Sequence, residues 1–234
     1  MKKIIALLTI LSLFTAIFAG CSGSVKAAPV VVNADEAQLY NELFHHDGAE
    51  TQVDKECVKE GIFATIYDAY LEGTRYYVWG FNDELKSGQW QWEIHPEDTS
   101  SLPSVGSKVS VTGTLVHDDG ALDGYWLINP SIEVNEKYSG YDCDIDLTVM
   151  SPTLQRVQVQ NIQRKQEQFE GKTVALYGRS HEGAAIMNPY GEEVWEFSVK
   201  SDDAFPQENT MILVQGTVTD GAIAQASVAE TDLY

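Results

Sequence analysis

The sequence predicts a mainly β protein with short helices, built as two tandem five-stranded barrels that are each preceded by a helix. Three observations support this fold class. The chain contains an internal repeat, each copy consists of short segments with alternating apolar residues, and a glycine interrupts the fourth segment of each copy. The 234 residues are 44% hydrophobic and 10% aromatic, which is enough for packed cores and excludes a wholly disordered chain.

The repeat is visible as two motifs that return with the same spacing. Trp92-Glu93-Ile94 returns as Trp195-Glu196-Phe197, and the segment VTGTL at 111–115 returns as VQGTV at 214–218, both 103 residues later. Two separate matches at one offset indicate a duplicated structural unit. Shorter pairs flank them, namely Glu60-Gly61 with Glu170-Gly171, and Asp119-Gly120 with Asp220-Gly221.

Five strands are expected in each copy, because β-branched and aromatic residues recur at every second position between turn-forming residues. Gly113 lies inside the fourth strand of the first copy, where glycine often marks a bulge or bend that curls a small barrel. The predicted strands of the first copy are 62–70, 75–81, 89–95, 108–116 and 122–134. Those of the second copy are 172–179, 182–188, 192–200, 210–218 and 222–229.

A helix is predicted before each set of strands. Asn33 followed by Glu36 fits a capping box, in which each side chain binds a backbone amide at the helix start. Ser151-Pro152 places a capping hydroxyl before a proline at the first helical position, and a helix over 154–169 follows.

Five short strands with a glycine bend in the fourth resemble the OB-fold, a small and partly open barrel. The segments GKTVALYG at 171–178 and VQGTV at 214–218 are similar to those of OB-like domains in bacterial lipoproteins. The resemblance covers most of 55–134 and 168–230. It implies that strands two and three form the ligand-binding surface, and the ligand is expected mainly on the aromatic-rich first copy.

The N-terminus is typical of an export signal. Met1-Lys2-Lys3 precedes an apolar run over 4–18, which is shorter than the ~20 residues of a membrane-spanning helix. Ala19-Gly20-Cys21 follows and resembles the lipobox of bacterial lipoproteins, which implies that Cys21 is lipidated and becomes the new N-terminus. The alternative is an ordinary secretory peptide cut elsewhere. The expected location is the extracytoplasmic face of the cell membrane.

These features give a domain organisation with four parts. We expect a lipoprotein signal peptide at 1–20, a tether at 21–33, a helix with the first barrel at 34–147, and a helix with the second barrel at 148–234. The chain has a formal charge of −20, from 15 basic and 35 acidic residues. This charge argues against nucleic-acid binding and against docking on anionic lipid through a basic patch, so membrane contact is expected through the lipid alone.

Aromatic residues in the second strand of the first copy suggest a ligand site. Tyr77, Trp79 and Phe81 share one strand face, while Tyr76 and Val78 share the other. A small barrel covers one apolar side of each strand, so the excess predicts an exposed aromatic stripe that binds a glycan or a protein. The alternative is that the stripe packs against the second domain or the N-terminal helix.

The chain carries little that predicts catalysis, a cofactor or a metal. Asp142, Asp144 and Asp146 alternate, but Leu147 and Thr153 stand where a calcium loop needs a glycine and an acid. A solvated edge strand is favoured for this segment. Zinc-ligand spacings, a nucleophile elbow and a phosphate-binding glycine loop do not occur in the sequence. The sequence therefore predicts a protein that is not an enzyme, with no cofactor and no metal.

Two cysteines remain once Cys21 is assigned to lipid. An even number in an exported protein favours a disulfide, and Cys57 and Cys143 flank the strands of the first copy. A bridge between them is therefore predicted, with two separate thiols as the alternative. The preferred function is a non-enzymatic cell-envelope lipoprotein that binds a protein or glycan ligand. Alternatives are an envelope protein that binds divalent cations such as calcium, and an accessory protein of a hydrolase.

Overall fold

The computed structural model describes residues 49–68, 73–81, 89–119, 124–138, 140–189 and 195–232, with the side chains of Phe81 and Gln89 excepted. All of them belong to one compact unit, Val32–Tyr234, so the predicted boundary between 147 and 148 falls inside it. The signal peptide, the tether, Cys21 and the helix expected from Asn33 lie outside the described residues. Within the described ranges, no helix is long and apolar enough to cross a membrane.

The described chain is mainly β, as predicted, and its strands form two sheets. The first sheet contains β1 (Glu56–Asp68), β2 (Gly73–Phe81), β3 (Gln89–His95), β4 (Lys108–Asp118) and β5 (Gly124–Glu136). The second contains β6 (Ile145–Asp146), β7 (Thr173–His181), β8 (Ala185–Met187), β9 (Glu196–Ser198), β10 (Met211–Thr219) and β11 (Ala222–Glu230). The helical segments are η1 (Ala49–Gln52), η2 (Leu147–Val149), α3 (Pro152–Arg164) and α4 (Gln166–Phe169).

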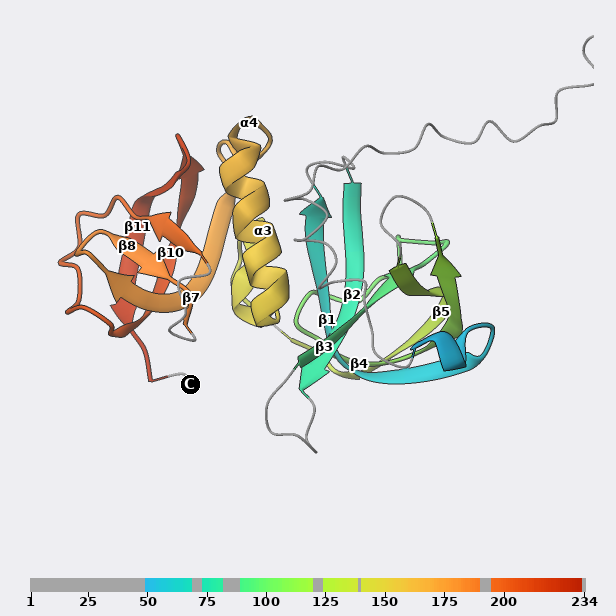
Figure 1. Ribbon diagram of the computed structural model, residues 1–234. Coiled ribbons are helices and arrows are strands. Elements are labelled where there is room, and N and C mark those ends of the chain that lie inside the picture. The colour runs from blue at the N-terminus through green and yellow to red at the C-terminus, as the bar shows by residue number, and fades with distance from the viewer. Residues whose placement is uncertain are drawn as a thin grey trace, which may run out of the picture. The chain divides into compact units, whose positions relative to one another are not determined.

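The first sheet closes on itself in the order β1-β2-β3-β5-β4 (Figure 1). Neighbouring strands are antiparallel except β3 and β5, which run parallel and pair Glu93 with Trp126 and Ile94 with Leu127. Closure joins β4 back to β1, with Cys57 opposite Gly113. A closed ring satisfies backbone groups that would otherwise form exposed sheet edges.

The second sheet repeats this order without closing. Its strands follow the order β11-β10-β7-β8-β9, and the short β6 pairs in parallel with β7. At the open side of this sheet, Val199 in the segment after β9 and Ile223 in β11 form an isolated parallel bridge. The two sheets therefore share a strand order, but one is a closed barrel and the other an open six-stranded sheet. The expectation of two alike barrels is not confirmed.

The glycine expected to bend the fourth strand lies opposite a bulge of the fifth strand in both sheets. The pairing register shifts between Thr112 and Thr114 in the first sheet, and between Gln215 and Thr217 in the second. In each shift the extra residue lies in the fifth strand of the sheet. The segment 128–131 of β5 faces 112–114 of β4, and 224–227 of β11 faces 215–217 of β10, so each repeated glycine lies opposite a β-bulge.

The register also corrects one of the flanking pairs in the repeat. Gly113 lies opposite Cys57 and Gly216 lies opposite Val174, so Gly61 corresponds to Gly178. The sequence comparison of Glu60-Gly61 with Glu170-Gly171 is therefore wrong by seven positions. A Cβ atom would lie 2.2 Å from the Trp79 carbonyl oxygen at Gly61, and 2.4 Å from that of Met187 at Gly178. Both strands use glycine because the neighbouring backbone leaves no room for a side chain.

Two hydrophobic cores organise the unit. One fills the first barrel, and its members are Ala49, Cys57, Phe63, Val78, Trp92, Ile94, Val109, Val111, Leu115 and Leu127. The other is continuous from the outer face of β1 and β2 through α3 to the second sheet. The helix α3 therefore packs against both the outer face of β1 and β2 and the second sheet.

The helix α3 begins as predicted. The Ser151 hydroxyl accepts a hydrogen bond from the Leu154 amide at 3.2 Å, and Pro152 occupies the first turn. The expected single helix is interrupted at Lys165, after which α4 adds one short turn. Three amide side chains of α3 are buried together with its apolar residues, namely Gln155, Gln158 and Asn161.

Candidate functional site

The aromatic stripe predicted to face solvent is buried where the structure describes it. Tyr77 is 0% exposed and Trp79 is 6% exposed. The Trp79 indole donates a hydrogen bond from Nε1 to the Val149 carbonyl at 3.0 Å, and both aromatic side chains join the core that contains α3. The prediction of an exposed stripe is therefore wrong for these two residues, because the stripe packs against the second half of the chain. The side chain of Phe81 lies outside the described residues.

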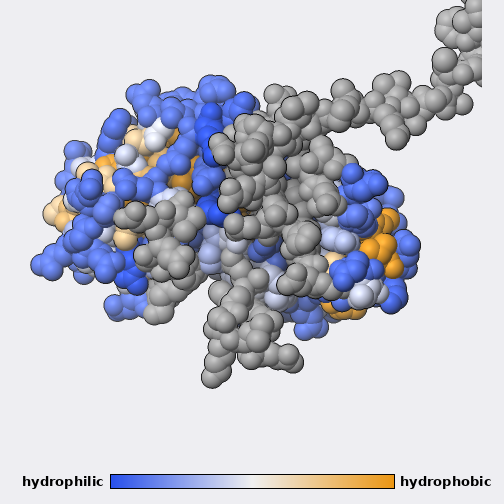
Figure 2. Space-filling view, viewed as in Figure 1, coloured by the Kyte–Doolittle hydropathy of each residue, from blue (hydrophilic) through white to orange (hydrophobic). Residues whose placement is uncertain are grey.

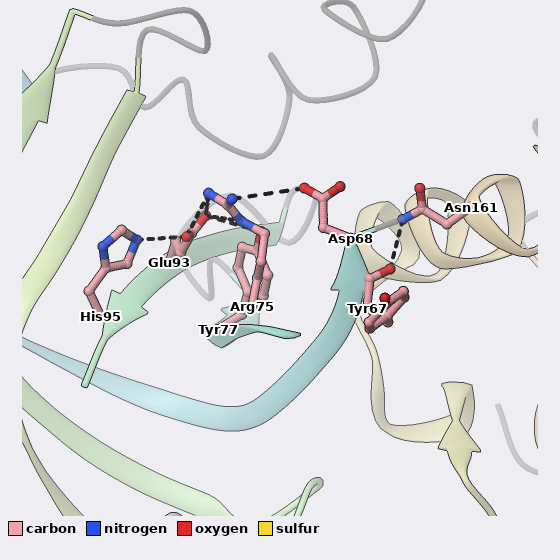
Figure 3. A network of polar contacts seen from close by, with 7 residues as sticks. All are labelled: Tyr67, Asp68, Arg75, Tyr77, Glu93, His95 and Asn161. Carbon is pink, nitrogen blue, oxygen red and sulfur yellow. Dashed lines mark hydrogen bonds and ion pairs between the residues drawn. The ribbon is translucent and has the colours of Figure 1, made fainter. Parts of the chain in front are cut away.

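A network of charged groups lies beside this stripe (Figure 3). Arg75 and Tyr77 alternate along β2, and Glu93 and His95 along β3, with Tyr77 directly opposite Glu93. Arg75 Nη2 lies 2.8 Å from Glu93 Oε1, and Nη1 lies 3.8 Å from a carboxylate oxygen of Asp68. Three neighbouring strands, β1, β2 and β3, thus bring five polar side chains together.

Glu93 is the centre of this network, and both of its oxygens have partners. Oε1 also lies 2.7 Å from His95 Nε2, while Oε2 accepts from Arg75 Nε at 3.2 Å and from the Tyr77 hydroxyl at 3.2 Å. Burial and the Glu93 charge raise the pKa of Tyr77, so the phenol remains a donor. Burial would lower the pKa of Arg75, but Glu93, Tyr77 and Asp68 together outweigh it and raise that pKa. The arrangement stabilises a buried face and leaves Glu93 poorly suited to act as a base.

The amide side chains of α3 bind backbone groups of β1 and of η2. The Tyr67 amide donates to Gln158 Oε1 at 2.8 Å. Asn161 Nδ2 donates to the Tyr67 carbonyl at 3.2 Å (Figure 3). Gln155 Nε2 donates to the Leu147 carbonyl at 2.9 Å. Sequence reasoning missed these residues. Their pattern is nevertheless visible, because uncharged amides recur at intervals of three residues on one helix face.

A cleft of about 770 Å³, half open to solvent, lies where the end of β1, the segment after β5, and the helices α3 and α4 meet. Four aromatic side chains line it, namely Tyr67, Tyr138, Tyr141 and Phe169. We call it the Tyr138 cleft. The Tyr67 ring meets the Phe169 ring edge-on, with centroids 5.6 Å apart. Apart from the Asp142–Asp146 segment, none of the lining residues was singled out from the sequence.

Two glycines seat the Tyr138 ring. A Cβ atom at Gly106 or at Gly140 would lie 2.3 Å from atoms of that ring. Gly106 also has a φ of +89°, a conformation that side chains other than glycine rarely adopt. The ring therefore lies on two stretches of bare backbone, and it is 36% exposed.

The alternating carboxylates line the cleft but bind different neighbours. Asp144 Oδ2 accepts from the Thr173 amide and hydroxyl at 2.9 Å each, and these bonds lower the pKa of Asp144. Asp146 Oδ2 accepts from the Tyr141 amide at 3.2 Å. Asp142 is exposed. Among the residues that the structure describes, no group of three or more His, Cys, Asp or Glu side chains is arranged to hold a metal ion.

Cys57 and Cys143 are separate thiols, so the predicted disulfide is wrong. Cys57 belongs to the core inside the barrel, where its Sγ lies 3.6 Å from Gln52 Oε1. Cys143 instead lines the Tyr138 cleft. Burial, with a contribution from the Asp146 charge, raises the pKa of Cys143 to about 11. The thiol is therefore protonated near neutral pH and is a weak nucleophile.

Gln158 is the most buried polar side chain on the cleft wall. It is 1% exposed, and its Nε2 has no hydrogen-bond partner among the described residues. Its carbonyl oxygen is bound by the Tyr67 amide, which fixes the orientation of the amide group. Buried polar groups are normally hydrogen-bonded, so an unpaired donor at a cleft requires an explanation.

Comparison of the chain with protein-family models, with curated proteins and with solved structures finds no match. The function must therefore be argued from the cleft and its surroundings.

Proposed function

We propose that this protein is a non-enzymatic, lipid-anchored binding protein of the cell envelope, with two OB-like modules and a glycan ligand. The ring order β1-β2-β3-β5-β4, the parallel pair β3 and β5, and the bulge opposite Gly113 support an OB-like first module. The same strand order and a bulge opposite Gly216 support the second. The lysines at 2 and 3, the apolar run and Cys21 support export and lipidation.

The Tyr138 cleft is the proposed ligand site and the observation on which the function rests. The stripe predicted for this role is occupied by the chain itself, whereas the cleft is open. Its volume of about 770 Å³ lies within the roughly 300–1,000 Å³ of small-ligand pockets. Aromatic rings with a few polar groups suit sugars, which stack one face on a ring and hydrogen-bond at their edges.

Size and polarity favour a glycan over a protein ligand. A stable protein interface buries about 1,200–2,000 Å² around an apolar centre. In the described part of the chain, the exposed large hydrophobic residues are Val58, Val134 and Tyr138. On the face drawn in Figure 2, apolar residues form small patches among hydrophilic ones. A ligand the size of the cleft fits this surface better than a broad protein face does.

Binding without catalysis is supported by the state of the reactive groups near the cleft. The Cys143 thiol is held protonated, and the carboxylates of Asp144 and Asp146 accept hydrogen bonds from the chain. Glu93, in the network beside α3, is bound on both oxygens. Each group therefore has a structural partner that competes with a role in acid–base chemistry.

Tyr138→Ala tests the site. The full-length lipidated protein in detergent is titrated with a library of neutral, acidic and amine-bearing oligosaccharides, and binding is measured by calorimetry. We expect at least one oligosaccharide to bind, and Tyr138→Ala to weaken it about tenfold, or about 1.4 kcal/mol. Val134→Ala is the matched control, because Val134 is also exposed but does not line the cleft. Absence of binding, or equal loss in both variants, would contradict the proposal.

Cys21→Ala tests the proposed anchor. Cells grown with labelled fatty acid should incorporate label into the wild-type protein and not into this variant, which should leave the membrane fraction. Cys143→Ala, which removes a thiol of the cleft, should keep both label and location. Label retained by Cys21→Ala would show that the leader is not of the lipoprotein kind.

A further inference from the structure

The Tyr138 cleft carries an excess of negative charge. Asp142, Asp144 and Asp146 line it, and the basic residue that lines it is Lys172. At neutral pH these four side chains sum to a charge of −2, in a chain whose formal charge is −20. A concave site lined by one sign of charge concentrates ligands of the opposite sign. The cleft therefore disfavours an anionic ligand and favours a cationic one.

The titratable groups of the cleft respond to this field. Burial raises the pKa of Cys143 and of Tyr138, and the charge of Asp146 raises both pKa values further. The thiolate of Cys143 and the phenolate of Tyr138 are therefore both disfavoured in the cleft. The Thr173 amide and hydroxyl lower the pKa of Asp144, which keeps that carboxylate charged. Near neutral pH, Cys143 and Tyr138 therefore stay neutral and Asp144 stays charged.

Gln158 supplies an independent requirement. Its Nε2 is a buried donor without a partner in the described ranges, and its oxygen is held by the Tyr67 amide at 2.8 Å. The group cannot turn its oxygen toward the cleft without losing that bond. A buried donor that stays unpaired is costly, so the ligand is expected to bring an acceptor. A cation without oxygen atoms, such as a plain alkylammonium ion, would leave this donor unsatisfied.

Together these observations narrow the ligand class. We infer that the Tyr138 cleft binds an amine-bearing glycan, with its protonated amine toward Asp142 and a hydroxyl or ring oxygen as acceptor for Gln158. This inference rests on the proposed glycan-binding function and deepens it. The aromatic rings provide a surface on which a sugar ring can stack. The carboxylates favour a positively charged ligand, and Gln158 favours a ligand that carries an acceptor oxygen. A neutral glycan satisfies the rings and Gln158 but not the charge.

Two tetrasaccharides with the same backbone separate charge from shape. The tetramer of β-1,4-linked glucosamine carries amines, whereas the tetramer of N-acetylglucosamine is neutral. In a mildly acidic buffer that protonates the amines, we expect the glucosamine tetramer to bind about tenfold more tightly. Added salt should reduce that advantage, because it screens partly exposed charges. Equal or tighter binding of the neutral tetramer would overturn the inference and leave the proposed glycan binding intact.

Tetralysine is the third probe, because it carries amines without sugar rings. If tetralysine binds as tightly as the glucosamine tetramer, charge alone decides and the glycan assignment fails with the inference. If no probe binds and the oligosaccharide library is also silent, the proposed function fails as well. Failure of the inference and failure of the proposed function therefore give different results.

Two pairs of variants locate the effect. Asp142→Asn should abolish most of the preference for the glucosamine tetramer, while Asp202→Asn, which removes an exposed carboxylate outside the cleft, should not. Gln158→Met should weaken both tetramers, while Gln155→Met should weaken neither. Both glutamines lie on α3 and are 1% exposed. Gln158 accepts a hydrogen bond from the Tyr67 amide, and Gln155 donates one to the Leu147 carbonyl. Both variants should therefore unfold at a lower temperature than wild type. Equal binding within either pair would contradict the assignment.

Discussion

The two sheets have the same strand order and different closure. In the first sheet, β2 and β3 span nine and seven residues, and β3 pairs with β5 at three positions. Their counterparts β8 and β9 span three residues each. The open side of the second sheet is joined by one bridge, Val199 with Ile223, and by two backbone hydrogen bonds of Lys200, to the Ile223 carbonyl and from the Ala226 amide. Shorter strands offer fewer ladder hydrogen bonds. The comparison shows that a repeated sequence conserves the order of pairing more readily than the length of each pairing.

The outer faces of the two sheets differ as well. Trp79 lies opposite Ile62 in the first sheet, and Met187 lies opposite Arg179 at the corresponding position of the second. Trp79 is buried in the core that contains α3, whereas Met187 is half-buried. The helix that precedes the second repeat therefore covers the outer face of the first. Corresponding outer positions of the two sheets therefore differ in burial, and the one on the first sheet is internal.

Trp79→Ala should have the largest effect on stability. We expect a loss of about 3–5 kcal/mol in the free energy of unfolding, because a large buried ring and its hydrogen bond are removed. Met187→Ala, at the corresponding position, should cost about 1 kcal/mol, because its side chain is only half-buried. Urea unfolding measures both. Similar losses would mean that the two outer faces are more alike than their burial indicates.

The glycines opposite the bulges should show an intermediate effect. At Gly216 a Cβ atom would lie 2.6 Å from Ile223 Cγ2 and 2.8 Å from the Ala224 carbonyl oxygen. At Gly113 the closest atom, the Ile128 carbonyl oxygen, is 3.0 Å away. Gly216→Ala should therefore lose about 1–3 kcal/mol of stability by overpacking, and Gly113→Ala should lose less. The reverse order in thermal or urea unfolding would show that the closed barrel tolerates a side chain less well than the open sheet.

The smallest expected effect concerns His181 in the second sheet. Its Nδ1 lies 2.7 Å from Glu208 Oε1, and Glu196 and Glu182 are close to its Nε2. The hydrogen bond with Glu208 and the three charges raise the pKa of His181. A raised pKa means that the protonated pair stabilises the fold below about pH 6.5, the ordinary value, and that this is lost as the pH rises through the folded-state value.

His181→Gln should therefore be less stable than wild type in mildly acidic buffer and equal to it at alkaline pH. Glu208→Gln should remove most of the same pH dependence. Parallel curves for wild type and His181→Gln across this range would argue against the pairing. The comparable pair in the barrel, His95 with Glu93, lies at 2.7 Å beside Arg75, which already balances the carboxylate charge.

Local features of the fold could be predicted from the sequence. The strands follow from alternation, which depends on neighbours in the chain. The bulges lie in the fifth strands, opposite Gly113 and Gly216, and not in the fourth strands that contain these glycines. β1 begins at Glu56, six residues before the predicted start, because Cys57 and Val58 are adjacent in this segment and break the alternation that identifies a strand. Closure of one sheet and not of the other depends on pairing lengths that residue patterns do not reveal.

The binding site could not be located from the sequence, for a different physical reason. Apolar residues on both faces of β2 indicate that both faces are covered or used, but not which segment covers them. In the structure, α3 covers one of these faces. The cysteines could not be paired from the sequence either, because their positions in the chain give no distance between them. A glutamine on a helix usually faces water, so the sequence does not single out Gln158. The signal that the sequence offers is three uncharged amides, Gln155, Gln158 and Asn161, at intervals of three residues.

The contact of α3 with Tyr67 has a consequence for solubility. β1 pairs with β4 from Glu56 to Ile62, so its later residues extend past that partner on one side. There, Gln158 and Asn161 occupy the Tyr67 amide and carbonyl, as a neighbouring strand would. An unoccupied strand at this position would invite pairing with another molecule and aggregation. The helix thus prevents this strand from pairing with another molecule. A variant with a loosened α3 should therefore self-associate before it unfolds.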